Sequence, residues 1–311
     1  MGAKIDFTNH IDISERTSVN GACRMYGYQD LTDEMISRIT SDPVIRFIQI
    51  SGPLPCQAYL AIDRILEKRE DMSFRIYGLL QDAEFDLSCL YLLKHLKRLT
   101  LDVHLRDRQD MLDLSVLTKL ENLRALRLAL FDLKDYSFIR DLSPDMEELC
   151  ISADTMGRGI LFDCAWLKRY NNLRTLYLGK KAKKHIESVA ELKSLENLTI
   201  RGIKLENFDF LRGTGLRSLS VHLCGMNDLT SLAYFDMLEA LELWRIAKLE
   251  DISFISTLTG LERLRLRDLK HITALPDLSA LKNLREIILE NVPADTAALP
   301  ADLQKIVRKY R

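Results

Sequence analysis

The sequence has no excess of charge of either sign. Its 311 residues include 44 lysines and arginines and 45 aspartates and glutamates, which gives a formal net charge of −1. Proteins that bind nucleic acid or an anionic membrane commonly carry a surplus of positive charge. The balance argues against both for the chain as a whole, and we expect neither a membrane nor a nucleic-acid partner.

The densest local run of positive charge, at residues 180–185, does not change this expectation. A patch of that size is too small to explain specific nucleic-acid binding by itself. No aromatic side chains interleave with the lysines, as a platform for stacking bases would require. We interpret the run as a solvated turn.

A long apolar stretch and a secretory leader are also missing. No uncharged apolar run approaches the roughly 18 residues that indicate a membrane-spanning helix. Residues 1–7 lack the basic start and apolar run of a signal peptide. We therefore expect a cytoplasmic protein, and a signal removed from the natural chain would change that expectation.

The six cysteines are far apart, and no two of them form a C-x-x-C pair. Widely separated cysteines are typical of reduced thiols in the cytosol, whereas disulfide frameworks and zinc sites show closer and more regular spacing. We expect reduced, mostly buried thiols. The residues concerned are Cys23, Cys56, Cys89, Cys150, Cys164 and Cys224.

Motifs for catalysis and cofactor binding are missing as well. The sequence contains no P-loop, G-x-G-x-x-G, G-x-S-x-G or H-E-x-x-H phrase. None of the six histidines has metal-ligand spacing to another histidine or to a cysteine. We predict that the protein is not an enzyme and has no catalytic residue, no metal and no cofactor. An enzymatic or nucleic-acid-binding element in the N-terminal region remains the alternative of a different class, although that segment is short for a catalytic core.

What the sequence does have is a repeated phrase, L-x-x-L-x-L, that recurs every 21 to 23 residues in the C-terminal half. Weaker copies lie at residues 45–50 and 71–76. Self-similarity at such a period is typical of a solenoid. The clear copies are Leu96-Leu99-Leu101, Leu123-Leu126-Leu128, Met146-Leu149-Ile151, Leu173-Leu176-Leu178, Leu195-Leu198-Ile200, Leu216-Leu219-Val221, Leu238-Leu241-Leu243, Leu261-Leu264-Leu266 and Leu284-Ile287-Leu289.

Each phrase ends in an alternation that predicts a short strand with one buried face. A second apolar set between phrases, such as Ile252, Phe254 and Ile255, suits a helical or 3-10 turn that packs on the strand. One such unit cannot bury its leucines alone, whereas stacked units can. The predicted fold is an α/β solenoid, a curved horseshoe with a parallel sheet on its concave face and short helices or 3-10 turns on its convex face.

With these phrases the chain resembles the leucine-rich-repeat proteins, over residues 44–292 and about eleven repeats. Among them it is similar to the bacterial SDS22-like and internalin-like repeats. The resemblance implies a non-enzymatic scaffold, monomeric and without a small-molecule substrate, that binds a protein partner on its concave face. It also allows an inhibitor or immunity-type protein that blocks a toxin or enzyme.

The sequence departs from this family at the position that usually holds asparagine in each turn. Apolar residues or cysteine stand there instead, and most of them cannot replace the hydrogen bonds of an asparagine side chain. Buried backbone groups need partners, so we expect irregular turns. The positions are Ile203, Cys224, Ile246, Leu269 and Val292.

The two ends lack the repeat, and we interpret them as caps over the open edges of the sheet. In the predicted N-terminal cap, residues 1–43, the pair Asn20-Gly21 predicts a tight hairpin and Thr32 predicts the start of a helix. A further helix is expected at residues 56–70, with an apolar stripe that includes Leu60. The predicted C-terminal cap, residues 293–311, is a helix opened by Pro300.

The side chains between the strand leucines should point out from the concave face. Trp244 is notable among them, because an outward tryptophan beside arginines is typical of a binding hot spot. The alternative is that Trp244 lies flat over its own repeat beneath Arg267. We also expect His222 to be the one outward-facing histidine. The predicted partner-binding residues are Tyr177, Arg201, His222, Glu242, Trp244, Arg263, Arg265 and Arg267.

Overall fold

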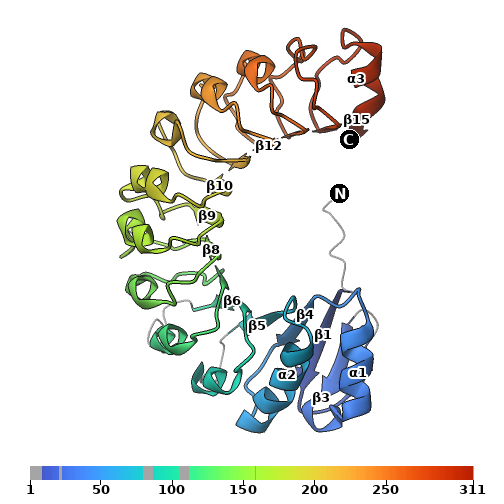
Figure 1. The fold of residues 1–311 in the computed structure, drawn as a ribbon, viewed down its shortest axis with the longest axis vertical. Helices are drawn as coiled ribbons and strands as arrows, with labels where there is room; N and C mark the ends of the chain where they lie inside the picture. The colour runs from blue at the N-terminus through green and yellow to red at the C-terminus, as the bar shows by residue number, and fades with distance from the viewer. Residues whose placement is uncertain (1–8, 21–22, 80–86, 106–111, 158, 311) are drawn as a thin grey trace. The chain divides into compact units, whose positions relative to one another are not determined.

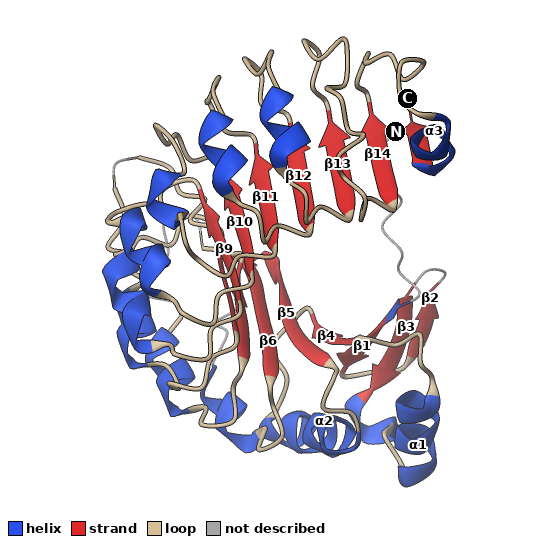
Figure 2. Cartoon of the chain, turned by 45° about the horizontal axis from the view of Figure 1, so that its top comes forward, coloured by secondary structure: helices blue, strands red, loops and turns tan. Residues whose placement is uncertain are grey.

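A computed structural model describes residues 9–20, 23–79, 87–105, 112–157 and 159–310 (Figure 1). The chain divides into two compact units, Met1–Leu161 and Phe162–Arg311, called here unit 1 and unit 2. In each unit the strands form one layer, and helices and 3-10 turns cover the opposite side (Figures 1 and 2). None of the described helices is long and apolar enough to cross a membrane.

Unit 1 contains a sheet in the order β8-β7-β6-β5-β4-β1-β3-β2, parallel except for the last pair. Two helices and several 3-10 turns connect its strands. The strands are β1 (His10–Ser14), β2 (Ser18–Asn20), β3 (Cys23–Gly27), β4 (Phe47–Ile50), β5 (Ser73–Leu79), β6 (Arg98–His104), β7 (Ala125–Leu128) and β8 (Glu148–Ile151). The helices are α1 (Asp33–Ser41) and α2 (Cys56–Lys68), and the 3-10 turns are η2 (Tyr28–Asp30), η3 (Leu87–Leu92), η5 (Leu114–Lys119) and η6 (Ser137–Asp141).

Unit 2 alternates strands and 3-10 turns with higher regularity, and its strands pair in sequence order from β9 to β15. All of these pairs are parallel. The strands are β9 (Thr175–Gly179), β10 (Asn197–Arg201), β11 (Ser218–His222), β12 (Ala240–Trp244), β13 (Arg263–Arg267), β14 (Glu286–Glu290) and β15 (Val307–Tyr310). The turns are η7 (Cys164–Arg169), η8 (Ile186–Glu191), η9 (Asp209–Leu211), η10 (Thr230–Tyr234) and η11 (Ser253–Thr257), and one helix, α3 (Ala301–Ile306), follows β14.

The repeat phrases supply the core of both units. Each predicted strand exists, from β4 to β14, and its leucines face the turns on the other side. In unit 2 the equivalent residues Leu198, Leu219, Leu241 and Leu264 pair in one row across the sheet, and each is no more than 2% exposed. The predicted leucine-rich-repeat solenoid with a parallel sheet is therefore confirmed.

The turns after the strands of unit 2 are regular, so the expectation of irregular turns was wrong. The residue that follows each strand from β9 to β14 adopts a left-handed conformation, for example Leu223 with φ 55° and Arg245 with φ 54°. Its N–H donates to the carbonyl of the last residue of the next strand, as Leu223 does to Trp244 at 2.8 Å. The backbone after each of these strands is thus paired with the neighbouring repeat, and Ile203 and Ile246 are buried in the core at positions where the family usually has asparagine.

Most of the turns on the side opposite the strands begin at an aspartate. At each one an aspartate carboxylate accepts a hydrogen bond from the backbone N–H two residues later, as Asp228 does from Thr230 at 2.8 Å. This local turn satisfies a donor at the start of the 3-10 segment. The same contact occurs at Asp113, Asp135, Asp163, Asp251, Asp277 and Asp295, and at Asn207 through its amide oxygen.

The N-terminal predictions are largely confirmed. Thr32 caps α1, because its hydroxyl accepts a hydrogen bond from the N–H of Met35 at 3.3 Å. Strands β2 and β3 pair as the predicted hairpin, and the two residues that connect them, 21 and 22, lie outside the described residues. The predicted stripe of α2 was wrong at Leu60, which is 52% exposed, while Tyr59 is buried in its place. Strand β1 was not predicted.

The C-terminal helix is shorter than predicted. Helix α3 begins after Pro300 and ends at Ile306, and residues 307–310 then form β15 beside β14. The open edge of β14 offers a row of unpaired backbone groups, and pairing with it outweighs the continuation of the helix. The predicted division of the chain into residues 1–43, 44–292 and 293–311 stays a prediction.

The prediction that all cysteines are reduced was wrong for one pair. Cys56 at the start of α2 and Cys89 in η3 form a disulfide across 33 residues of sequence. Sequence spacing gave no sign of it, because the two residues become neighbours only when α2 packs beside η3. Cys150, Cys164 and Cys224 are free and buried, as predicted.

We expect the disulfide to stabilise unit 1. Closing a loop of this length reduces the entropy of the unfolded chain, and Cys56→Ser should lower the free energy of unfolding by about 3 kcal/mol. Denaturant titrations of both proteins without reductant would measure the difference. With reductant present the two proteins should unfold at the same midpoint. Equal stability without reductant would contradict the disulfide.

Candidate functional site

The strand register of unit 2 places the predicted binding residues in defined rows. Arg201, His222, Trp244 and Arg267 are successive partners in the row at the carboxyl ends of the strands. Glu242 and Arg265 pair in the neighbouring row, and Arg263 lies two residues before Arg265. Tyr177 belongs to the same row as Glu242, but it lies on β9, three strands away. The structure therefore brings together five of the eight residues, which we call the Trp244 cluster: His222, Glu242, Trp244, Arg265 and Arg267.

Trp244 is half-buried and held on three sides. Its indole N–H donates to Asp268 Oδ2 at 2.9 Å. The guanidinium of Arg267 lies over its ring at 4.7 Å from the centroid, and the ring of His222 meets it edge-on at 5.3 Å. The stacking of Arg267 that the alternative interpretation required is thus present, and part of the indole surface remains accessible beside it.

Charges of both signs alternate around this tryptophan. Glu242 accepts a hydrogen bond from Arg267 at 3.2 Å and lies 3.7 Å from Arg265 Nε and 3.4 Å from His222 Nε2. Glu290 binds the guanidinium of Arg267 through both carboxylate oxygens, at 2.8 and 3.4 Å. Trp244, Arg267 and Glu242 are therefore held by hydrogen bonds, whereas Arg265 Nε and His222 Nε2 lie near Glu242 without a hydrogen-bond partner among the described residues.

These contacts lower the pKa values of two carboxyl groups, those of Glu242 and Asp268. Burial would raise the pKa of Glu242, but His222, Arg267 and Arg265 outweigh it and hold the pKa below its usual value. The pKa of Asp268 is lowered by hydrogen bonds from Asn291 and Trp244. Both carboxylates are consequently ionised at neutral pH.

Asp268 and Glu290 were missed by the prediction. Asp268 occupies the left-handed position after β13, so it does not belong to the alternating strand pattern that predicts the outward residues. Glu290 lies in the same row as Trp244, one strand beyond Arg267. The repeat pattern places Glu290 on the outward face although it is not among the predicted binding residues, whereas no pattern predicts the bond from Trp244 to Asp268.

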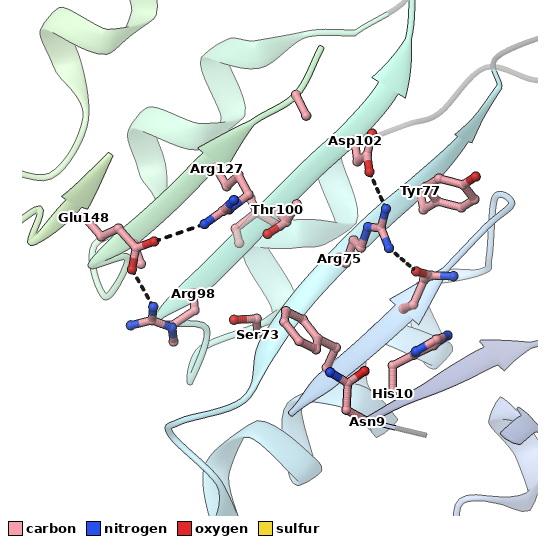
Figure 3. A pocket seen from close by; sticks show the side chains of 15 residues that line it. Asn9, His10, Ser73, Arg75, Tyr77, Arg98, Thr100, Asp102, Arg127 and Glu148 are labelled. Carbon is pink, nitrogen blue, oxygen red and sulfur yellow. Dashed lines mark hydrogen bonds and ion pairs between the residues drawn. The ribbon is translucent and has the colours of Figure 1, made fainter. Parts of the chain in front are cut away.

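A hollow lies on the strand face of unit 1 (Figure 3). It has a volume of about 870 Å³ and is lined by residues from β1, β4, β5, β6, β7 and β8. His10 contributes to its wall, and His104 at the end of β6 is exposed, so the expectation that His222 alone faces outward was wrong. The hollow was not predicted.

The basic run of unit 2 is partly anchored. Lys184 and His185 contact the carboxylate of Asp163, at 3.1 and 2.8 Å, and Asp163 also begins η7. Ala182, within the same run, is buried. The run is a turn fastened to the neighbouring repeat, in agreement with its interpretation as a turn.

Chemistry at the buried thiols is unfavourable. Burial raises the pKa of Cys150 to about 11 and that of Cys164 to about 12. A thiol must lose its proton to act as a nucleophile or a metal ligand, and these keep theirs at neutral pH. In the part of the chain that the structure describes, no three residues among His, Cys, Asp and Glu are placed to hold a metal ion.

Comparison of structures gives leucine-rich-repeat proteins. An internalin from Listeria monocytogenes matches with a TM-score of 0.50 at 17% sequence identity, over 85% of this chain and 77% of that one. A leucine-rich-repeat protein from Leptospira interrogans matches with a TM-score of 0.46 at 15% identity, over 90% of this chain and 80% of that one. Comparison of the sequence with protein-family models and with curated protein sequences gives no match. The internalin-like leucine-rich-repeat resemblance is thus confirmed for the fold.

The Trp244 cluster can be tested through Arg267. Arg267→Lys should lower the free energy of unfolding by about 1 kcal/mol, because lysine cannot keep the stacked, two-pronged contact with Trp244 and Glu290. Denaturant unfolding followed by tryptophan fluorescence would measure it. Arg263→Lys on the same strand is the matched control, since Arg263 is exposed and the change should stay within about 0.5 kcal/mol. Equal effects of the two substitutions would contradict the described contacts.

Proposed function

We propose that this chain is a non-enzymatic scaffold that binds a protein partner on the strand face of unit 2. The observation that carries the proposal is Trp244, a half-buried indole fixed by Asp268 and Arg267 on an open sheet. Tryptophan and arginine are the residues most enriched at interface hot spots. The predicted contact residues Tyr177, Arg201, His222, Glu242, Trp244, Arg263, Arg265 and Arg267 are kept as this proposed surface.

The internal contacts of the cluster favour binding. Fixing a long side chain at an interface costs roughly 0.5–1.5 kcal/mol of entropy for each one. Arg267 and Glu242 are already held by their neighbours, so a partner that covers them loses little of this entropy. The alternative is that Trp244 only packs within the solenoid and binds no partner. It involves the same internal contacts, and it predicts that substitution of Trp244 leaves partner binding unchanged.

The surface around the cluster supplies the polar rim of an interface. Arg263 is exposed near Arg265 on β13. Arg201 at the end of β10 pairs with His222 at the end of β11. Two outward residues of β10 and β11, Thr199 and Ser220, are small and lie between Tyr177 and Glu242 in their row. A rigid anchor with a polar rim is the usual anatomy of a protein interface.

The compartment and the partner are also proposals. The predicted cytoplasmic location and bacterial source stay predictions, and the Cys56–Cys89 disulfide favours an oxidising compartment instead. A monomer without metal, cofactor or small-molecule substrate is still expected. Whether the partner is a toxin or enzyme that this chain inhibits is decided by assaying the captured partner with and without it.

Binding through Trp244 predicts a clear loss on substitution. Trp244→Ala together with Arg265→Ala should raise the Kd for a partner captured from the native host by about 30-fold or more, since removal of a hot spot costs at least about 2 kcal/mol. Affinity capture followed by mass spectrometry identifies the partner, and titration calorimetry with the purified proteins gives the Kd.

Tyr234→Ala is the matched control. Tyr234 is 61% exposed on η10 and carries a stacked arginine, Arg212 at 3.6 Å, so it resembles Trp244 but lies on the turn layer of the unit. Its loss should leave the Kd unchanged. If the Trp244 and Arg265 substitutions left capture intact, or if Tyr234→Ala weakened it equally, the strand face would not be the binding surface.

A further inference from the structure

The lining of the hollow of unit 1 combines small residues with long ones. Thr100 on β6 and Ala125 and Ala129 at β7 are among the small residues. Arg75 and Tyr77 rise from β5 on one side, and Glu148 rises from β8 on the other. Figure 3 shows Arg75 beside Asp102 and the Glu148 carboxylate directed toward Arg98 and Arg127, with Thr100 between Arg127 and Arg75.

The side chains that line the hollow include more arginines than carboxylates. Arg75, Arg98 and Arg127 line it, against the carboxylates of Asp102 and Glu148. The nearby Asp12 is buried beneath the surface, where its carboxylate accepts a hydrogen bond from Gln49 at 2.8 Å and lies 3.9 Å from His10. Asp12 lies in the same row as Arg75, and Gln49 between them donates to the Asp12 carboxylate and accepts a hydrogen bond from Arg75.

The three arginines differ in the number of hydrogen bonds that they donate to neighbouring side chains. Arg75 donates to Asp102 and to Gln49 and stacks on Tyr77 at 4.5 Å. Arg98 donates to Glu148 at 2.5 Å. Arg127, whose side chain is 55% exposed, lies 3.6 Å from the same carboxylate, which is too long for a hydrogen bond.

Arg127 thus shares one carboxylate with Arg98. Its planar donors remain open to an acceptor that approaches from the hollow. Arg127, Thr100 and Arg75 are consecutive partners in one row across β7, β6 and β5. A ligand lying across the strands would meet donors from all three.

The extent of the hollow identifies the kind of ligand. Its lining comes from six adjacent strands, and five steps between strands span roughly 24 Å. A small molecule would cover one end of such a surface, whereas an extended peptide covers it entirely. Carboxylates are the acceptors that arginine binds with two parallel hydrogen bonds.

We propose that the hollow of unit 1 binds an extended, acidic peptide segment of a protein partner, with a glutamate or aspartate carboxylate of the segment bound by Arg127. This site lies on the other unit from the Trp244 cluster and does not rest on the function proposed for it.

The test uses the full chain and a fluorescent peptide of alternating glutamate and serine, with a glutamine version as the neutral probe. Fluorescence anisotropy at low salt should show binding of the acidic peptide alone, weakened as salt is added. Arg127→Ala should raise the Kd at least tenfold. Arg38→Ala, which removes an exposed arginine of α1, should leave the Kd unchanged.

A second variant separates a binding role from a merely structural one. Glu148→Gln removes the carboxylate that competes for Arg98 and Arg127, so the acidic peptide should bind several-fold more tightly. Trp244→Ala should have no effect, which distinguishes this site from the surface of unit 2.

Several outcomes would overturn the proposal. These are equal binding of the glutamine peptide, an unchanged Kd in Arg127→Ala, an equal loss in Arg38→Ala, or no binding of the acidic peptide. Free glutarate that binds as tightly as the peptide would also overturn it and would indicate a site for small carboxylates.

Discussion

The parallel pairing of the strands without offset is the constraint on which both units depend. In unit 2 the row from Leu176 through Leu241 to Ile287 consists of direct partners on successive strands. A single repeat cannot bury these side chains, so each repeat is stabilised by the next one. A slip of one residue would exchange the buried and outward faces of a strand. The register that buries the core therefore also determines which residues become neighbours on the outward face of the sheet.

On the outward face the same register makes neighbours of residues that are more than 20 positions apart in sequence. Trp244 meets Arg267 and His222 because all three occupy one row. In unit 1 the row of Arg75 and Arg127 has Thr100 between them, and the short side chain leaves space where a longer one would close it. In unit 2 the outward face around Trp244 is filled by side chains that contact one another. In unit 1 the outward face around Thr100 is left hollow.

The sequence predicted what local periodicity encodes. Alternation with a period of two identified the strands from β4 to β14 and their outward columns, because the buried face is written into each repeat. It did not predict the Cys56–Cys89 disulfide or β15, since both depend on contacts between elements distant in sequence. The site was predicted in part for the same reason. The column of Trp244 follows from the repeat, whereas its bond to Asp268 follows from the shape of a turn.

The disulfide of unit 1 has a mechanical consequence. It joins α2 to η3 in the outer layer and encloses β5, while the described strands contact one another through non-covalent interactions. If the chain were pulled from its ends, the repeats could peel away one after another, but residues 56–89 would remain a closed loop. The fully stretched molecule would be shorter by roughly 110 Å, the length of about 33 extended residues. Reduction of a single bond would release that length.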